Sequence, residues 1–455
     1  MTTTRRIGWG IAIAAVAGVG VAMRINNALR YPVDMGFDAI GNWEYVALLI
    51  RSWTLPPPDT GWSTAHPPFF YAFAAAIAKG LGLETKASAV HAIRLATAGC
   101  GLLGIAAAGR LVRRVEPDDP QRRFLCVALL LLLPVHVYMS AMLSEEILVS
   151  ALVSLAVVGV ALDLLAGPGA PRPDWRVAGF GALAGLALLT KLSGLLVVGM
   201  GALAYLAEGA RSGDLGAGLR RGVVFGLAAS VVGGWYYLWN LYAYGYLYPH
   251  GLEVHAVMFR MPPGERELLD YLRIPLQTFT DPQLLAPDLL RSVWGSTHVT
   301  IWFDGHRQFL PLASETVRRL GGLMSSFALV PTLAFAVGVA RGARRLWRGS
   351  TGPDLVLVPL VVVTFAGYVL FTWRNPWFAV LKGSFLLGLA VPFAYYASEV
   401  LTDWVRGRGV RAWSIWIGLA ILAGLSVALF SYGLVYAKLE VPGVPWQVPE
   451  RTWQG

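Results

Sequence analysis

Three carboxylates follow the first apolar segment of the chain, and their spacing suits acid–base chemistry. Asp34, Asp38 and Glu44 fall within eleven residues of one another. A carboxylate in such a loop can act as a general base toward an acceptor hydroxyl. The alternative is structural: a solvated loop acid, or Asp38 as the cap of a helix that runs to about Trp53. The residue types alone leave both interpretations open.

The segment 62–71 reads WSTAHPPFFY and holds a single histidine, His66. Two prolines follow it and restrict the backbone, so they hold His66 in an extended entry to a short apolar helix. Its imidazole can form a hydrogen bond with a phosphate or a sugar. A purely structural histidine is the alternative.

Two adjacent carboxylates, Glu145 and Glu146, lie in a tight turn between two apolar segments. Charged groups that border hydrocarbon are costly unless they are paired or used in function. A functional role is therefore one interpretation. The other is structural, because Ser144 can cap the next helix and acids in a first turn interact favourably with the helix dipole.

Three cations stand near the ends of apolar segments. Lys191 is alone between two apolar runs, and Arg374 and Lys382 lie near the ends of later ones. Each can hold an anionic lipid phosphate through charge-assisted hydrogen bonds. Snorkelling of the long side chain to the membrane interface is the alternative.

The polar stretch 241–319 adds histidines and aromatic residues. The motifs WGSTH, ending at His298, and WFDGH, ending at His306, can shape a site for a sugar or a lipid headgroup. His250 and His255 precede them, but the spacing forms no zinc pattern, and we expect no metal. The sequence has no Walker loop and no strand-flanked GxGxxG, so a nucleotide-sugar donor is disfavoured and no cofactor is expected.

The composition places these residues in a membrane protein. Of 455 residues, 56% are hydrophobic and 14% are charged, against about 25% charged in a soluble domain. Apolar runs of about 20 residues cross the hydrocarbon core as helices. We expect an all-α polytopic membrane protein with about eleven transmembrane helices. Their predicted ranges are 7–23, 88–110, 123–140, 145–165, 177–190, 192–207, 220–240, 320–341, 354–372, 377–400 and 412–437.

Some of these ranges leave alternatives. The ranges 177–190 and 192–207 are either two helices that meet near Lys191 or one broken helix. The apolar segment 69–81 is short for a span and favours an interfacial or re-entrant helix. The range 7–23 has the composition of a signal peptide, but more apolar runs follow, so we interpret it as an uncleaved first helix.

Arginine placement predicts the orientation. With a cytoplasmic N-terminus, every short inner loop is rich in arginine and the short outer loops have little positive charge apart from Arg374, the positive-inside pattern. The long loops 24–87 and 241–319 and all five lysines then fall on or near the outer side. The membrane explains the net charge of +10, and no nucleic-acid partner is expected. We predict one transmembrane domain, 1–455, in the plasma membrane, with its active site on the outer face.

Taken in order, these features resemble the GT-C membrane glycosyltransferases. The nearest branch is glycosyltransferase family 39-like, with the protein O-mannosyltransferases and aminoarabinose lipid A transferases. The shared features are an outer-loop Asp, an interfacial helix entered through HPP-FFY, a SEE turn, and the segment 179–194, GFGALAGLALLTKLSG. The resemblance covers about residues 1–400. It implies a GT-C-type helix bundle with interfacial helices in the first outer loop.

The resemblance also implies an activity: an inverting glycosyltransferase that moves a sugar from a polyprenyl-phosphate-linked donor to an acceptor hydroxyl. Asp38 matches the catalytic base, with Asp34 as the alternate. Glu145 or Glu146 matches a second acid that positions the acceptor or the sugar. The implied partners are the lipid-linked donor, a lipid, glycan or protein acceptor, and membrane lipids. The cations that match a donor-phosphate site are Lys191, Arg374 and Lys382.

Other functions stay open. A transporter or flippase of lipid-linked substrates is one, although it would be expected to show inverted repeats and charges in mid-helix, and the sequence has no repeat. An inactive GT-C-like assembly subunit is another. It is suggested by departures from the family pattern, which are Ala39 after the loop acid, Asn42 where a histidine is common, and Ser384-Phe385 where Arg-Tyr is common.

Overall fold

The computed structural model describes residues 3–167, 169–249, 261–310, 315–407 and 409–434, and over these ranges it is helical and contains no strand. Nine helical stretches of the described chain are long and apolar enough to cross a membrane. They are Ile7–Arg30, Lys86–Val115, Glu146–Leu165, Gly194–Ser212, Leu215–Tyr244, Glu315–Trp347, Asp354–Arg374, Phe378–Val405 and Val410–Phe430. The chain is therefore a multi-pass, all-α membrane protein, as the sequence predicts.

Nineteen α-helices and four other helical turns make up the described fold. The first half contains α1 (Thr3–Arg30), α2 (Ala39–Ser52), α3 (Phe69–Gly80), α4 (Lys86–Val115), α5 (Pro120–Leu131), α6 (Pro134–Met139), α7 (Glu146–Leu165), α8 (Asp174–Thr190), α9 (Gly194–Ser212), α10 (Leu215–Ala229), η1 (Ser230–Gly234) and α11 (Trp235–Tyr244). The second half contains η3 (Leu268–Tyr271), α12 (Gln277–Thr280), α13 (Pro287–Arg291), α14 (Val293–Trp302), α15 (Glu315–Phe327), α16 (Leu329–Trp347), α17 (Asp354–Arg374), η4 (Phe378–Val380), η5 (Gly383–Leu389), α18 (Ala390–Val405) and α19 (Val410–Phe430).

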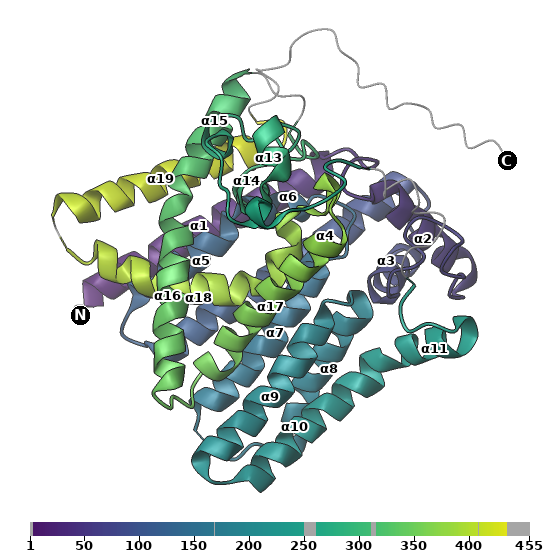
Figure 1. Cartoon of the computed structure of the whole chain (residues 1–455), viewed down its shortest axis with the longest axis horizontal. Coiled ribbons are helices and arrows are strands. Elements are labelled where there is room, and N and C mark those ends of the chain that lie inside the picture. The colour runs from purple at the N-terminus through teal and green to yellow at the C-terminus, as the bar shows by residue number, and fades with distance from the viewer. Residues whose placement is uncertain (1–2, 168, 250–260, 311–314, 408, 435–455) are drawn as a thin grey trace.

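The range around Lys191 is resolved into two helices. α8 ends at Thr190 and α9 begins at Gly194, and both pack against α10 and against each other. Figure 1 shows the three running side by side. α8 has 17 residues, which keeps it just below the length of the nine long helices. The segment predicted as the first outer loop contains the predicted short helix as α3, preceded by α2, which ends at Ser52 beside the expected boundary.

The predicted span 123–140 is broken rather than continuous. α5 ends at Leu131 and α6 begins at Pro134, because a proline has no N–H to continue the ladder. The predicted end of the first helix at residue 23 is also too early, since α1 continues to Arg30. The break between α5 and α6 and the extension of α1 to Arg30 have a common physical cause. The Arg24 guanidinium is buried, donates to the Leu131 carbonyl that the break leaves open (2.9 Å), and lies 2.9 Å from His136 Nδ1.

The predicted span 377–400 is not a continuous α-helix either. Its first part consists of the 3₁₀ turns η4 and η5, and α18 begins only at Ala390. Non-helical backbone at this depth requires partners elsewhere in the protein. The Gly383 N–H donates to Thr300 Oγ1 (2.8 Å), and the Ser150 hydroxyl donates to the Leu387 carbonyl (2.8 Å). The extended backbone of Lys382 precedes η5.

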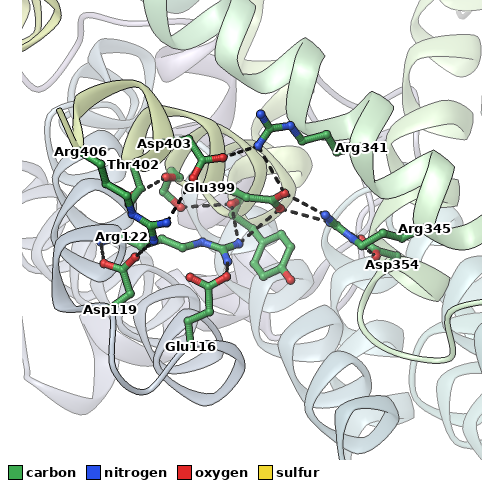
Figure 2. Close-up of polar contacts among 12 residues, drawn as sticks. Glu116, Asp119, Arg122, Arg341, Arg345, Asp354, Glu399, Thr402, Asp403 and Arg406 are labelled. Carbon is green, nitrogen blue, oxygen red and sulfur yellow. Dashed lines mark hydrogen bonds and ion pairs between the residues drawn. The ribbon is translucent and has the colours of Figure 1, made fainter. Parts of the chain in front are cut away.

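The fold separates two charged regions. α7 has 20 residues, so its two ends lie about 30 Å apart. At its C-terminal end, arginines and carboxylates from α5, α16, α17 and α18 form the ion-pair network of Figure 2. The short helices α2, α3 and α6 gather at the other end, toward the top and right of Figure 1. A continuous apolar core lies between them.

Candidate active site

Asp38 occupies a strained position immediately before α2. Its backbone is left-handed (φ 55°), which costs a residue other than glycine about 1 kcal/mol or more. The side chain forms no capping hydrogen bond to α2. Instead, Oδ1 accepts a hydrogen bond from Trp62 Nε1 (2.9 Å), and Oδ2 lies 3.6 Å from Lys382 Nζ. Asp38 therefore occupies the cap position of α2, as expected, but its carboxylate contacts Lys382 instead of capping the helix.

The turn 191–193 and the SEE turn meet beside Asp38. Lys191 Nζ lies 2.5 Å from Glu146 Oε1 and 3.3 Å from Glu145 Oε1, and both carboxylates are over 90% buried. The Ser384 hydroxyl donates to the same Glu146 oxygen (3.2 Å). Ser144 has its structural role as well, because its hydroxyl accepts from the Glu146 N–H (3.3 Å). Lys191 is thus turned into the protein rather than snorkelling.

Aromatic faces hold the two lysines near each other. Phe385 lies under both, with its ring centre 4.7 Å from Lys191 Nζ and 5.8 Å from Lys382 Nζ. Lys382 also stands over the Phe37 ring at 4.3 Å. Such cation–π contacts are stronger when the ammonium is desolvated. The Phe385 ring of η5 therefore connects the Asp38–Lys382 ion pair with the ion pairs of Lys191 to form one cluster.

A chain of hydrogen bonds connects His66 to the turn that carries Glu145. The Tyr71 hydroxyl donates to Asn42 Oδ1 (2.9 Å), and the Asn42 amide donates to the Leu143 carbonyl (2.8 Å). Because the Tyr71 proton is committed to Asn42, its oxygen accepts from His66 Nδ1 (3.0 Å). The chain connects the loop before α3 with α2 and with the turn that carries Glu145.

The electrostatics keep these groups charged. Burial opposes ionisation of Asp38, but Lys382, the Trp62 N–H, His66 and Lys191 outweigh it and lower its pKa below the ordinary value. Burial likewise opposes ionisation of Glu145, yet Lys191 and His66 lower its pKa. Burial also disfavours the charged form of Lys191, while Glu146 and Glu145 raise its pKa. At neutral pH Asp38 and Glu145 are therefore ionised and Lys191 is protonated.

The predicted outer stretch 241–319 reaches the same cluster through His306. Its ring meets Phe37 edge-on at 5.3 Å, and Nε2 lies 3.1 Å from the Leu381 carbonyl. Burial and nearby Lys382 lower the pKa of His306 to about 3, so the imidazole is neutral. His298 instead bonds the Ser325 carbonyl. His250 and His255 lie outside the described residues.

Two predicted residues lie apart from the cluster. Asp34 forms an ion pair with Lys86, and its side chain is 61% exposed. Arg374 is the exposed last residue of α17 and makes no hydrogen bond or ion pair within the described chain. The structure therefore joins six of the eight predicted residues, namely Asp38, His66, Glu145, Glu146, Lys191 and Lys382. The described residues contain no group of three or more His, Cys, Asp or Glu side chains that could hold a metal ion.

Several residues of the cluster were not predicted from the sequence. Trp62 and Tyr71 lie within the WSTAHPPFFY segment, which drew attention to His66 alone. Asn42, Ser384 and Phe385 mark departures from the family pattern, and each has a contact here. The departures were thus a usable signal, because a position where the family places a charged or aromatic residue faces the site.

Comparison with known proteins identifies the fold. No family model and no curated protein matches the chain. Among solved structures, the Archaeoglobus fulgidus oligosaccharyltransferase in complex with Zn and sulfate aligns at a TM-score of 0.53 and 16% identity, over 92% of this chain and 53% of that chain. AglB of the same organism, in complex with an inhibitory peptide and a dolichol-phosphate, aligns at 0.52 and 16%, over 95% and 56%. The chain therefore shares the fold of these archaeal oligosaccharyltransferases over most of its length.

The structural similarity to these solved proteins is limited in two respects. The chain spans about half the length of the archaeal oligosaccharyltransferases it matches. ArnT from Cupriavidus metallidurans, in the apo state, aligns over 86% of this chain and 77% of that chain at 17% identity, but its TM-score of 0.40 is too low to carry an argument. The comparison therefore establishes the architecture, and the chemistry has to be argued from the site.

Proposed function

We propose that the chain is an inverting glycosyltransferase that moves a sugar from a polyprenyl-phosphate-linked donor to an acceptor hydroxyl. One observation carries the proposal. The Asp38 carboxylate, held in a strained backbone and not used as a helix cap, faces Lys382 at 3.6 Å beside a second cation, Lys191. A transfer of this kind needs a base for the acceptor and cations for the departing phosphate.

In the proposed reaction, Asp38 accepts the proton of the acceptor hydroxyl as its oxygen forms the new bond to the anomeric carbon. The bond from that carbon to the phosphate oxygen breaks on the opposite face, so the anomeric configuration inverts. The electron pair stays on polyprenyl phosphate, where Lys382 and Lys191 stabilise the developing charge. When Lys382 turns from Asp38 to the phosphate, the carboxylate loses its partner and its pKa rises, which makes it a stronger base.

The other acids and His66 have supporting roles in this proposal. Glu145 and Glu146 hold Lys191 and position the acceptor or the sugar, and His66 contacts donor or acceptor. Arg374 remains a candidate for holding the donor phosphate, and Asp34 is kept as the alternate base. The dolichol-phosphate in the AglB complex supports a lipid-phosphate donor for a protein of this fold.

The proposed setting follows from the same arrangement. The four described lysines lie at the end of the bundle that holds the Asp38 cluster, and the arginines of the Figure 2 network lie at the other end. By the positive-inside pattern the cluster faces the outer side of the plasma membrane and the N-terminus is cytoplasmic. Membrane lipids surround the bundle, and a lipid, glycan or protein supplies the acceptor hydroxyl.

The first prediction tests Asp38 as the base. Asp38→Asn should lower turnover by about 10²–10⁴-fold, the usual contribution of a general base, and leave folding and membrane insertion intact. The assay incubates the purified protein with a panel of polyprenyl-phosphate sugars and measures released polyprenyl phosphate and glycosylated products by mass spectrometry. Asp59→Asn, at an exposed position of the same outer loop, is the matched control, and Asp34→Asn tests the alternate base.

The outcomes separate the candidate functions. If Asp34→Asn abolishes turnover and Asp38→Asn does not, the base is Asp34. If no donor in the panel is consumed and Asp38→Asn changes nothing in cells, the transferase proposal fails and the inactive-subunit interpretation stands. Movement of a lipid-linked sugar across vesicles without any released polyprenyl phosphate would support a flippase.

A further inference from the structure

A separate hollow of about 360 Å³ opens at the arginine-bearing end of the bundle, a full length of α7 away from Asp38. Its lining combines three guanidinium groups with a short apolar wall. The lining residues are Arg110 and Arg114 of α4, Leu162 and Leu165 of α7, Ala166 after α7, and Arg176 of α8.

The charges around this hollow are only partly neutralised. Arg176 pairs with the buried Asp163 at 2.6 Å, and Arg172 pairs with the buried Glu208. The side chains of Arg110 and Arg114 are exposed and form no hydrogen bond or ion pair with any residue that the structure describes. They are four positions apart and therefore project from one face of α4, where their like charges repel. An anion between them and Arg176 would relieve that repulsion.

Two observations place the hollow at a membrane interface. Trp175, next to Arg176, is 76% exposed, and exposed tryptophans mark the headgroup level of a bilayer. Leu165 belongs to the apolar wall and is itself 37% exposed. A ligand there meets guanidinium groups on one side and hydrocarbon on the other, which matches a phosphate attached to acyl chains.

A neighbouring hollow provides an internal contrast. It is larger, about 680 Å³, but it is lined by Glu116, Asp118 and Asp119 as well as Arg406. Glu116 is paired with Arg122, and Asp119 is paired with Arg406, the one guanidinium of this lining, so no unpaired guanidinium faces this second hollow. The preference for a phosphate is therefore a property of the first hollow and not of every concavity on this side.

We propose that the hollow formed by Arg110, Arg114 and Arg176 is a binding site for the phosphate headgroup of an acidic membrane lipid. Guanidinium groups bind phosphate oxygens in a bidentate manner, and basic pockets between transmembrane helices bind acidic headgroups. The site goes beyond the proposed transferase and does not rest on it, because it shares no residue with the Asp38 cluster.

The test is native mass spectrometry of the purified full chain in detergent, titrated with phosphatidylglycerol or with phosphatidylcholine. Wild-type protein should bind phosphatidylglycerol in preference. The Arg110→Gln/Arg114→Gln variant should bind it roughly thirtyfold more weakly, as expected for loss of two cations at a lipid headgroup. The matched control, Arg113→Gln/Arg348→Gln, removes two exposed arginines outside the hollow and should retain wild-type affinity within about twofold.

Three results would overturn the proposal. Equal weakening in both double variants would mean that overall charge, not the hollow, attracts the lipid. Equal binding of phosphatidylcholine would remove the headgroup preference. Inorganic phosphate that binds as tightly as the lipid, and competes with it, would make this a site for soluble phosphate. Matching gel-filtration profiles of the two variants ensure that a loss of binding is not a loss of folding.

Discussion

At the scale of single residues, the candidate site consists of opposite charges that keep one another ionised. Burial alone would raise the pKa of Asp38, but its pKa is low because Lys382 and the Trp62 indole stabilise the carboxylate. Of these two partners, Trp62 donates one hydrogen bond to Oδ1 and carries no charge that a donor phosphate would need. It therefore offers a way to change the base without removing a phosphate ligand.

The Trp62→Phe variant should move the acidic limb of the pH–rate profile to higher pH. Without the indole N–H, the pKa of Asp38 rises toward its ordinary value, so a smaller fraction is ionised at low pH. Well above that limb Asp38 is ionised in both proteins, so the variant should keep its turnover within about tenfold of wild type. Turnover is measured from about pH 2 to pH 8, a range that includes the ordinary pKa of an aspartate. An unmoved acidic limb would show that Asp38 is not the titrating base.

At the scale of elements, small residues decide how closely the helices that carry Lys191 can pack. A Cβ on Gly181 would lie 2.3 Å from the Phe225 carbonyl oxygen, and one on Gly185 would lie 2.6 Å from the Ala229 carbonyl oxygen. The repeated glycines in the segment 179–194 therefore allow the backbone of α10 to approach α8. Lys191 follows directly after α8 and depends on that packing for its position.

Gly185→Ala should destabilise the protein by about 1–3 kcal/mol, because the added methyl forces α8 and α10 apart. Gly179→Ala lies on the same helix with nothing within 4 Å of its Cβ and should be neutral or slightly stabilising. The midpoint of thermal unfolding in detergent compares the two variants. Equal midpoints would mean that the two helices can separate at no cost.

At the scale of the whole molecule, the sequence was informative where a pattern is local or repeated. Apolar run lengths predict the helices, and arginine placement separates the two ends. The failures arose where distant segments compensate one another. Arg24 lies within α1 because the α5–α6 break supplies a carbonyl for it, and the start of 377–400 is 3₁₀ because Thr300 and Ser150 satisfy its backbone. The Asp38–Lys382 contact joins segments from opposite ends of the chain, and residue types predicted each partner but not the pairing.

The ion-pair network of Figure 2 connects these distant segments at the arginine-bearing end. Glu399 of α18 is at its centre, with Arg345 Nη1 2.8 Å from Oε1 and Arg122 Nη2 3.7 Å from Oε2. Arg345 continues to Asp354 of α17 (2.7 Å). One carboxylate thus ties α5, α16 and α18 together, and Arg122 is almost fully buried.

Glu399→Gln should lower stability by about 1–3 kcal/mol, because it removes one of the two carboxylates that each of Arg122 and Arg345 pairs with. Asp403→Asn, at the exposed edge of the same network with 42% of its side chain accessible, should cost less than about 1 kcal/mol. Both variants should keep wild-type turnover at low temperature, because the network lies a full helix length from Asp38. Half-lives of activity on heating measure the stability difference. If Glu399→Gln instead lost turnover at low temperature with an unchanged half-life, the two ends of the bundle would be coupled, and the network would belong to the catalytic cycle rather than to the framework.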